Sequence, residues 1–183
     1  MRRAGMAVLI VAALVFLLGQ ATKLPKAGDK TPTFSVTTMD GKTVTSADLT
    51  KQGPVLLLFI GHSCPTTHVV FKHYNKLEEQ LAGCGIKRYM VLDAKADAAK
   101  SFVAKHSAKF PVLLDPDKKA FRAFGLTRSP ATALLTKGGK VAKFDLGISR
   151  SILTATATEA YKLVGKKAPK LDFADAPANT AVG

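Results

Sequence analysis

The pattern of apolar and polar positions predicts a chain in which strands and helices alternate. An unbroken apolar run at 54–60 indicates a central strand buried on both faces, as in parallel sheets that are covered by helices. From Pro65 the period changes to that of an amphipathic helix, which ends before Gly83. Its apolar stripe consists of Val70, Tyr74, Leu77 and Leu81.

The same patterns predict the other elements and their order. A β-hairpin is expected at 34–45 and a second one at 131–146. Further predicted elements are strands at 89–92 and 111–114 and helices at 96–106, before 124 and at 151–163. A hairpin, a β-α-β-α-β unit and a second hairpin with a helix predict one mixed α/β sheet with helices on both faces.

The N-terminus has the pattern of an export segment. Arg2 and Arg3 precede sixteen uncharged, mostly apolar residues at 4–19. This stretch is shorter than the roughly 20 residues that a spanning helix needs, and small residues near Ala21 suit signal-peptidase cleavage. Two interpretations stay open: a cleaved signal peptide at 1–21 or an uncleaved membrane anchor. Both place the body of the protein outside the cytoplasm, either secreted or periplasmic, or attached to the membrane.

Composition indicates one folded domain with a basic surface. We expect a polar linker at 22–30, the domain at 31–165 and, because few apolar residues remain, a disordered tail at 166–183. With 47% apolar residues the domain needs no disulfide or metal to fold. The net charge of +14 comes from scattered lysines and arginines without interleaved aromatic residues. A solvated surface that favours anionic neighbours, such as a membrane, therefore fits better than nucleic-acid binding.

Of the two cysteines, Cys64 has the position expected of a reactive thiol. It follows the buried strand and precedes the long helix, whose N-terminal N–H groups and dipole favour a thiolate. An inert cysteine is more typical of a strand centre or the apolar face of a helix. Cys84 lies beyond that helix, roughly 27 Å away at 1.5 Å per residue. We expect Cys84 to be a free or buried thiol; the alternative is a resolving partner after local unfolding.

Several segments together resemble a known family. They are 34–44 (FSVTTMDGKTV), 54–59 (PVLLLF), Cys64-Pro65, 110–115 (FPVLLD) and 129–132 (SPAT). In this order and spacing, over about 27–150, the chain is similar to the redoxin branch of the thioredoxin fold. That branch contains the peroxiredoxins (the alkyl hydroperoxide reductase and thiol-specific antioxidant group) and the membrane-tethered, TlpA- and ResA-like thiol-disulfide oxidoreductases. The resemblance implies a thioredoxin-like α/β fold with an N-terminal β-hairpin, and an oxidoreductase or antioxidant activity without a cofactor.

The resemblance also implies a site formed by Cys64, Thr67, Arg128 and Pro130. In the family the proline is cis and lies against the active-site cysteine. Dithiol members carry Cys-x-x-Cys, whereas in this chain Thr67 occupies the position of the second cysteine. Its hydroxyl can donate to a thiolate but cannot resolve a mixed disulfide. Peroxidase members have a hydroxyl residue where this chain has Gly61, and an arginine near the thiolate, which Arg128 matches loosely.

The leading hypothesis is an extracytoplasmic redox protein in which Cys64 attacks a peroxide or a disulfide and an external thiol reductant resolves the product. A second hypothesis is a non-catalytic binding module, because the second cysteine is missing. A third is copper handling by Cys64 and His68, which are four residues apart on the helix. Copper-binding relatives normally supply two cysteines, so we predict no metal site. His73 and His106 are predicted to be surface residues.

Overall fold

The computed structural model describes residues 23–183, so the predicted signal peptide or anchor at 1–21 lies outside the described residues. The strands are β1 (Ser35–Thr38), β2 (Thr43–Thr45), β3 (Val55–Ile60), β4 (Lys87–Leu92), β5 (Val112–Leu114), β6 (Ala131–Leu135) and β7 (Val141–Leu146). The helices are α2 (Ser46–Thr50), α3 (Pro65–Gln80), α4 (Ala96–His106), α5 (Lys119–Ala123) and α6 (Arg150–Leu163). Within residues 23–183, no helix has the length and apolar character needed to cross a membrane.

The strands form one mixed sheet, as the sequence pattern predicts. Their order is β2-β1-β5-β4-β3-β6-β7. The central strand β3 pairs in parallel with β4 and antiparallel with β6, while β4 continues in parallel to β5. The hairpins β1–β2 and β6–β7 form the two edges. All six residues of β3 are buried, which agrees with its unbroken apolar sequence.

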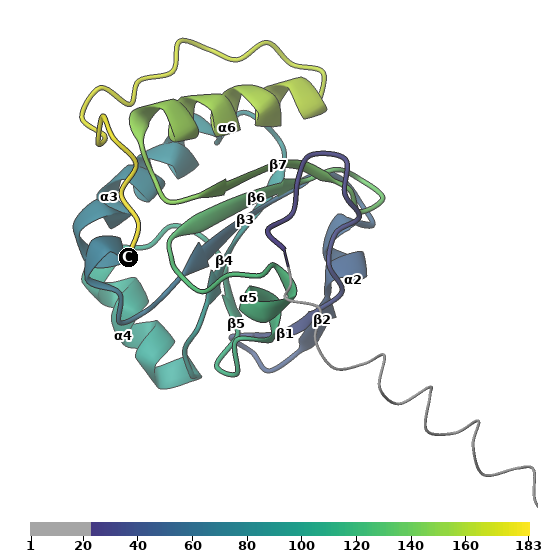
Figure 1. Ribbon diagram of the computed structural model, residues 1–183, viewed down its shortest axis with the longest axis vertical. Coiled ribbons are helices and arrows are strands. Elements are labelled where there is room, and N and C mark those ends of the chain that lie inside the picture. Colours follow the sequence, from purple (N-terminus) through teal and green to yellow (C-terminus); the bar gives the residue numbers. More distant parts are fainter. Residues whose placement is uncertain (1–22) are drawn as a thin grey trace, which may run out of the picture.

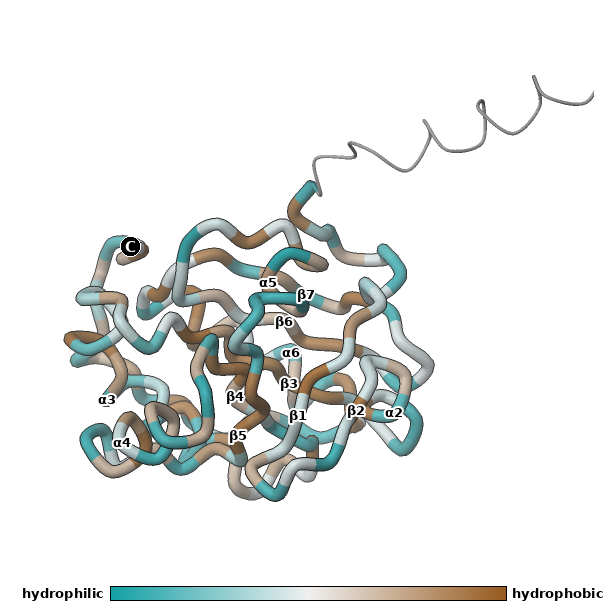
Figure 2. The backbone as a smooth tube through the Cα atoms, turned by 90° about the horizontal axis from the view of Figure 1, so that it is seen from below, coloured by the Kyte–Doolittle hydropathy of each residue, from teal (hydrophilic) through white to brown (hydrophobic). Residues whose placement is uncertain are grey.

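Helices cover both faces of this sheet (Figure 1). Alternate residues of β3 point to opposite sides, so Leu56 and Leu58 pack with α3, α4 and α6, whereas Leu57 and Phe59 pack with α2 and α5. Figure 2 shows the most hydrophobic backbone colours along the central strands. The molecule therefore has two apolar layers, one on each side of the sheet.

The pairing of β3 with β6 brings two distant loops together. Phe59 of β3 lies opposite Ala131 of β6 in an antiparallel register. The chain after β3 and the chain before β6 consequently leave the sheet at the same edge. The first leads to Cys64 at the start of α3, and the second contains Ser129 and Pro130. The register of the sheet thus places the predicted cysteine beside the predicted proline.

Three segments differ from the sequence-based expectation. Residues 28–30, predicted as a linker, pair with the β7 edge. The Gly28 N–H donates to the Val141 carbonyl, and the backbones of Lys30 and Lys140 form an antiparallel β-bridge. Residues 166–183, predicted to be disordered, lie against the body and bury Phe173 and Ala176 in the α3–α6 layer. Isolated apolar residues in a polar stretch show no periodicity, so the pattern could not reveal their docking. The short helix α2, capped by Thr45 and Asp48, was also not predicted.

Candidate redox site

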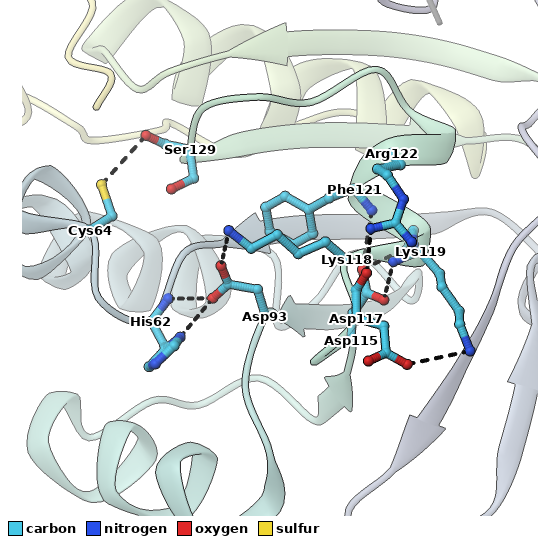
Figure 3. Close-up of polar contacts among 11 residues, drawn as sticks. His62, Cys64, Asp93, Asp115, Asp117, Lys118, Lys119, Phe121, Arg122 and Ser129 are labelled. Carbon is cyan, nitrogen blue, oxygen red and sulfur yellow. Dashed lines mark hydrogen bonds and ion pairs between the residues drawn. The ribbon is translucent and has the colours of Figure 1, made fainter. Parts of the chain in front are cut away.

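Cys64 is the N-cap residue of α3 and is partly exposed. Its backbone is extended (φ −74°, ψ 118°), and Pro65 occupies the first helical turn. The Cys64 carbonyl already accepts the first helical hydrogen bond, from the His68 N–H at 3.2 Å. The thiol donates to the Ser129 carbonyl, with a sulfur–oxygen distance of 3.8 Å (Figure 3). The side chain is therefore held between a helix N-terminus and the loop before β6.

The surroundings of Cys64 favour its thiolate. Burial of the sulfur alone would raise the pKa of the thiol. Hydrogen bonds from the Thr67 side chain and backbone, from the Ser129 side chain and from the Thr66 backbone outweigh that effect, and the net pKa of Cys64 is lowered. This is the effect expected where unpaired N–H groups of a helix end face an anion.

Thr67, at the position of the second motif cysteine, is fully buried beneath Cys64. Among the described residues its hydroxyl has no hydrogen-bond partner. The same hydroxyl is the first of the groups that lower the Cys64 pKa. A buried donor without another partner can donate to a thiolate at Cys64, which stabilises the charged form.

The Ser129-Pro130 peptide bond is cis, which confirms the geometry implied by the resemblance. Ser129 is buried, and its carbonyl is the acceptor for the Cys64 thiol. Its backbone N–H and carbonyl both point toward the region in front of the sulfur, where they pair with Gly183. The loop thus presents one peptide edge next to the nucleophile.

A pocket of about 470 Å³ opens beside Cys64. Its walls include Cys64, Asp93, Lys118, Arg128, Ser129 and Gly183. Arg128 is exposed at this pocket, and among residues 23–183 no hydrogen bond or ion pair joins it to Cys64. The structure therefore brings Cys64, Thr67 and Pro130 together, whereas Arg128 lies on the pocket wall without contacting the sulfur.

The sequence analysis missed a polar cluster at the floor of this pocket. The Asp93 carboxylate, at the end of β4, accepts from the His62 backbone N–H at 2.7 Å and pairs with His62 Nδ1 at 2.9 Å. Lys118 Nζ lies 3.1 Å from its other oxygen (Figure 3). Asp93 is buried, so these contacts fix the loop that leads to Cys64. The sequence did offer one indication of this cluster, because an aspartate directly after a buried parallel strand is typical of a site residue.

Gly61 departs from the peroxidase pattern for a steric reason. A Cβ at this position would lie 2.6 Å from the Ser129 hydroxyl oxygen and 3.2 Å from Cys64 Cβ. Ser129 fills the space that a side chain would need, so the hydroxyl residue of the peroxidase members does not fit here without a shift of Ser129. A glycine at this position allows the two loops to approach each other.

The remaining histidines do not form a metal site with Cys64. His68 Nδ1 pairs with His106 Nε2 at 2.6 Å, and the two rings stack on each other near Phe102. No cluster of three or more His, Cys, Asp or Glu suited to a metal occurs within residues 23–183. The prediction of a surface position was wrong for His73, which is buried, because the C-terminal segment covers that part of α3.

Cys84 is a free, fully buried thiol, as expected. It packs in the same apolar layer as Leu77 and Leu81 at the far end of α3. Burial raises the pKa of its thiol, despite the Ile86 backbone and the nearby charges of Arg88 and Lys166. Cys84 therefore differs from Cys64 both in exposure and in the direction in which its pKa is shifted.

A mixed sheet, a cysteine at a helix N-terminus and a cis-proline beside it define a thioredoxin-fold thiol protein. The comparisons with known proteins are consistent with this class. The family model described as Redoxin matches residues 26–161, and the chain belongs to the redoxin family. As a member of this family it is an oxidoreductase.

Individual relatives agree with that assignment. The thiol-disulfide oxidoreductase ResA of Bacillus thuringiensis (strain Al Hakam) is 32% identical over 122 residues, which are 66% of this chain and 69% of that protein. Among solved structures, DsbF of MTB is 27% identical with a TM-score of 0.59, covering 69% of this chain and 94% of that one. Peroxidoxin BcpB of Mycobacterium tuberculosis is 20% identical with a TM-score of 0.59, covering 76% and 96% of the two chains, a likeness of fold alone.

Proposed function

We propose that this protein is an extracytoplasmic thiol-disulfide oxidoreductase that works through the single cysteine Cys64. One observation carries the proposal. The Cys64 thiol, whose pKa is lowered, lies beside the peptide edge of Ser129, while Thr67 replaces the second cysteine of the dithiol motif. A nucleophile and a binding edge are present, and an internal resolving thiol is absent from that motif.

The chemistry is exchange in two balanced steps. The Cys64 thiolate attacks a substrate disulfide R–S–S–R′, forms Cys64–S–S–R and releases R′–S⁻. An external thiolate then attacks that mixed disulfide, forms its own disulfide with R and returns the Cys64 thiolate. The buried hydroxyl of Thr67 stabilises the attacking and the leaving sulfur at Cys64. The loop of Ser129 and Pro130 orients the substrate, and Arg128 adds positive charge at the pocket wall.

Disulfide exchange fits the site better than peroxide reduction. The position of the peroxidase hydroxyl is Gly61, where Ser129 leaves little space for a side chain. Arg128, the loose match to the peroxidase arginine, forms no hydrogen bond or ion pair with Cys64 in the described part of the chain. By contrast, a pocket of about 470 Å³ beside a peptide edge that already pairs with extended backbone at Gly183 suits an extended polypeptide.

The proposed location rests on the sequence. Arg2 and Arg3 followed by the apolar stretch 4–19 have the pattern of a signal peptide or anchor. Disulfide substrates are stable outside the cytoplasm, where this chemistry is needed. Attachment to an anionic membrane would also suit the net charge of +14.

The test uses the reduced chain and a peptide that carries a glutathione mixed disulfide. We expect a mixed disulfide on Cys64 that persists until reduced glutathione is added, is absent in Cys64→Ser and is unchanged in Cys84→Ser. In Thr67→Cys the introduced thiol should resolve the adduct without added thiol, leaving a chain two hydrogens lighter. All species are followed by mass spectrometry of the intact chain.

Two outcomes would contradict the proposal. One is an adduct that resolves unaided in the natural sequence. The other is the absence of an adduct together with rapid, selective sulfenic-acid formation on Cys64 by one equivalent of hydrogen peroxide, trapped as it forms. The second result would favour peroxide reduction.

A further inference from the structure

The C-terminal segment, residues 166–183, follows a defined path over the domain. After α6 it turns back and passes over the layer formed by α3 and α6 (Figure 1, yellow). At its end, Gly183 approaches Cys64. Phe173 and Ala176 are both only 3% exposed and belong to the apolar cluster of that layer. These two side chains anchor the segment seven to ten residues before Gly183.

Charged residues of the segment are paired with α3. Lys76 Nζ lies 3.3 Å from Asp172 Oδ2 and 2.9 Å from Asp175 Oδ1. His73, buried beneath the segment, has Nδ1 at 3.4 Å from the second oxygen of Asp175. Lysine and two carboxylates therefore hold the anchored part of the segment against the helix that begins at Cys64.

Beyond the anchor, the segment pairs backbone to backbone with the edge that leads to the site. The Arg150 N–H donates to the Pro177 carbonyl at 2.8 Å. Ile148 and Ala181 exchange two hydrogen bonds, of 2.9 and 2.8 Å. Gly183 and Ser129 also exchange two, with the Gly183 N–H donating at 2.9 Å and the Ser129 N–H donating at 3.3 Å. This is antiparallel strand pairing, the mode in which extended peptides bind to open edges.

Residue 183 occupies an informative position in this pairing. A Cβ built on Gly183 would lie 2.8 Å from the sulfur of Cys64 and 2.9 Å from the Thr66 hydroxyl oxygen. In a disulfide, the Cβ of one cysteine lies about 3 Å from the sulfur of the other, given the usual bond lengths. Gly183 thus stands where the disulfide cysteine of a bound polypeptide would stand.

We propose that residues 177–183 are a built-in occupant of the Cys64 site, which covers the thiol and must leave before another polypeptide can pair with Ser129. The identity of that competitor, a disulfide-bearing polypeptide, rests on the proposed function. Glycine at 183 has no side chain and no sulfur, so the segment covers Cys64 without reacting with it. The anchor at Phe173 and Ala176 keeps the displaced segment close enough to return.

The first test introduces a thiol by Gly183→Cys. With oxidised glutathione as the oxidant, two thiols are converted to one internal disulfide and two molecules of reduced glutathione are released. We expect this disulfide to join Cys64 to position 183 within one chain, at a rate independent of protein concentration. The matched control is Ala178→Cys, because Ala178 lies beside Arg150 and Thr154 at the start of α6. Equal cross-linking of both variants, or dimers only, would overturn the proposal.

The second test measures access to Cys64 without redox chemistry. The rate of labelling by a bulky polymer-linked maleimide is divided by the rate for N-ethylmaleimide, so that intrinsic thiol reactivity cancels. A chain ending at Ala176 retains the anchor and both ion pairs. In that chain the ratio should rise at least about tenfold, because an open state is ordinarily populated at 10% or less. Lys76→Gln, which loosens the segment without shortening it, should raise the ratio by a smaller factor. An unchanged ratio in both variants would contradict the proposal.

These readouts separate the inference from the function on which it rests. Cross-linking at 183 and a rise in the labelling ratio support the occupant whether or not Cys64 exchanges with the glutathione-linked peptide. If they fail while the peptide adduct still forms, the segment does not cover the site and the oxidoreductase proposal stands.

Discussion

The two ends of α3 carry the only two cysteines of the chain, and they differ in every property that governs thiol chemistry. Cys64 is the N-cap, is partly exposed and has a lowered pKa. Cys84 follows the C-terminal end, is fully buried and has a raised pKa. The same residue type is thus suited to reaction before the first turn of the helix and to packing beyond its last turn.

The difference shows that nearby positive charge affects the thiol pKa less than burial and hydrogen bonding do. Cys84 has Arg88 and Lys166 in its surroundings, yet burial outweighs their effect and raises its pKa. Cys64 has no cation among the groups that lower its pKa, which are the hydrogen-bond donors of Thr66, Thr67 and Ser129. Hydrogen-bond donors around the helix N-terminus therefore account for the lowered pKa of Cys64, as expected where a charge is partly withdrawn from water.

The largest effect expected from this contrast is selective alkylation. At pH 7 iodoacetamide should modify Cys64 about 100-fold faster than Cys84 or more, because exposure and thiolate fraction act in the same direction. Since the Cys64 pKa is lowered, its alkylation rate should begin to fall at a lower pH than that of an ordinary thiol, as the pH drops through the lowered pKa. Peptide mapping by mass spectrometry over a pH series measures both rates. Equal labelling of the two thiols in the folded chain would contradict the expected difference in reactivity between Cys64 and Cys84.

A second, smaller effect should come from Thr67→Val, which removes the hydroxyl and keeps the shape. The Cys64 pKa should rise, and alkylation at pH 7 should slow about tenfold, the size of one lost hydrogen bond to a charged group. Thr66→Val is the matched control, because Thr66 acts through its backbone N–H, which valine keeps. If both variants behaved alike, the hydroxyl of Thr67 would have no specific role.

The smallest effect on the site is expected at the opposite end of the helix. Cys84→Ala should leave the Cys64 alkylation rate within about twofold, while the small cavity lowers the free energy of unfolding by about 1 kcal/mol. Urea denaturation measures the second quantity. A strong loss of Cys64 reactivity at unchanged stability would mean that Cys84 takes part in the chemistry, as a resolving thiol would.

Local pattern was sufficient for the parts of the site that lie on one element or its border. The apolar run of β3 and the amphipathic stripe of α3 predicted where Cys64 lies, because both signals arise from contiguous residues. The cis geometry of Pro130 followed from the resemblance. The contact of Asp93 with His62 could not be predicted from local pattern, because it joins residues 31 positions apart through the pairing of β3 with β4.

The sequence by itself determined the mixed sheet, the order of its elements and a cysteine at the start of a helix, since hydrophobic period and position along the chain carry that information. Only the tertiary structure decided what faces the sulfur. The buried Thr67 hydroxyl, the Ser129 edge and the course of residues 177–183 depend on which polar groups stay outside the hydrogen bonds of the sheet and the helices. Such groups occur in every segment of a chain, and folding alone selects the few that meet at one site.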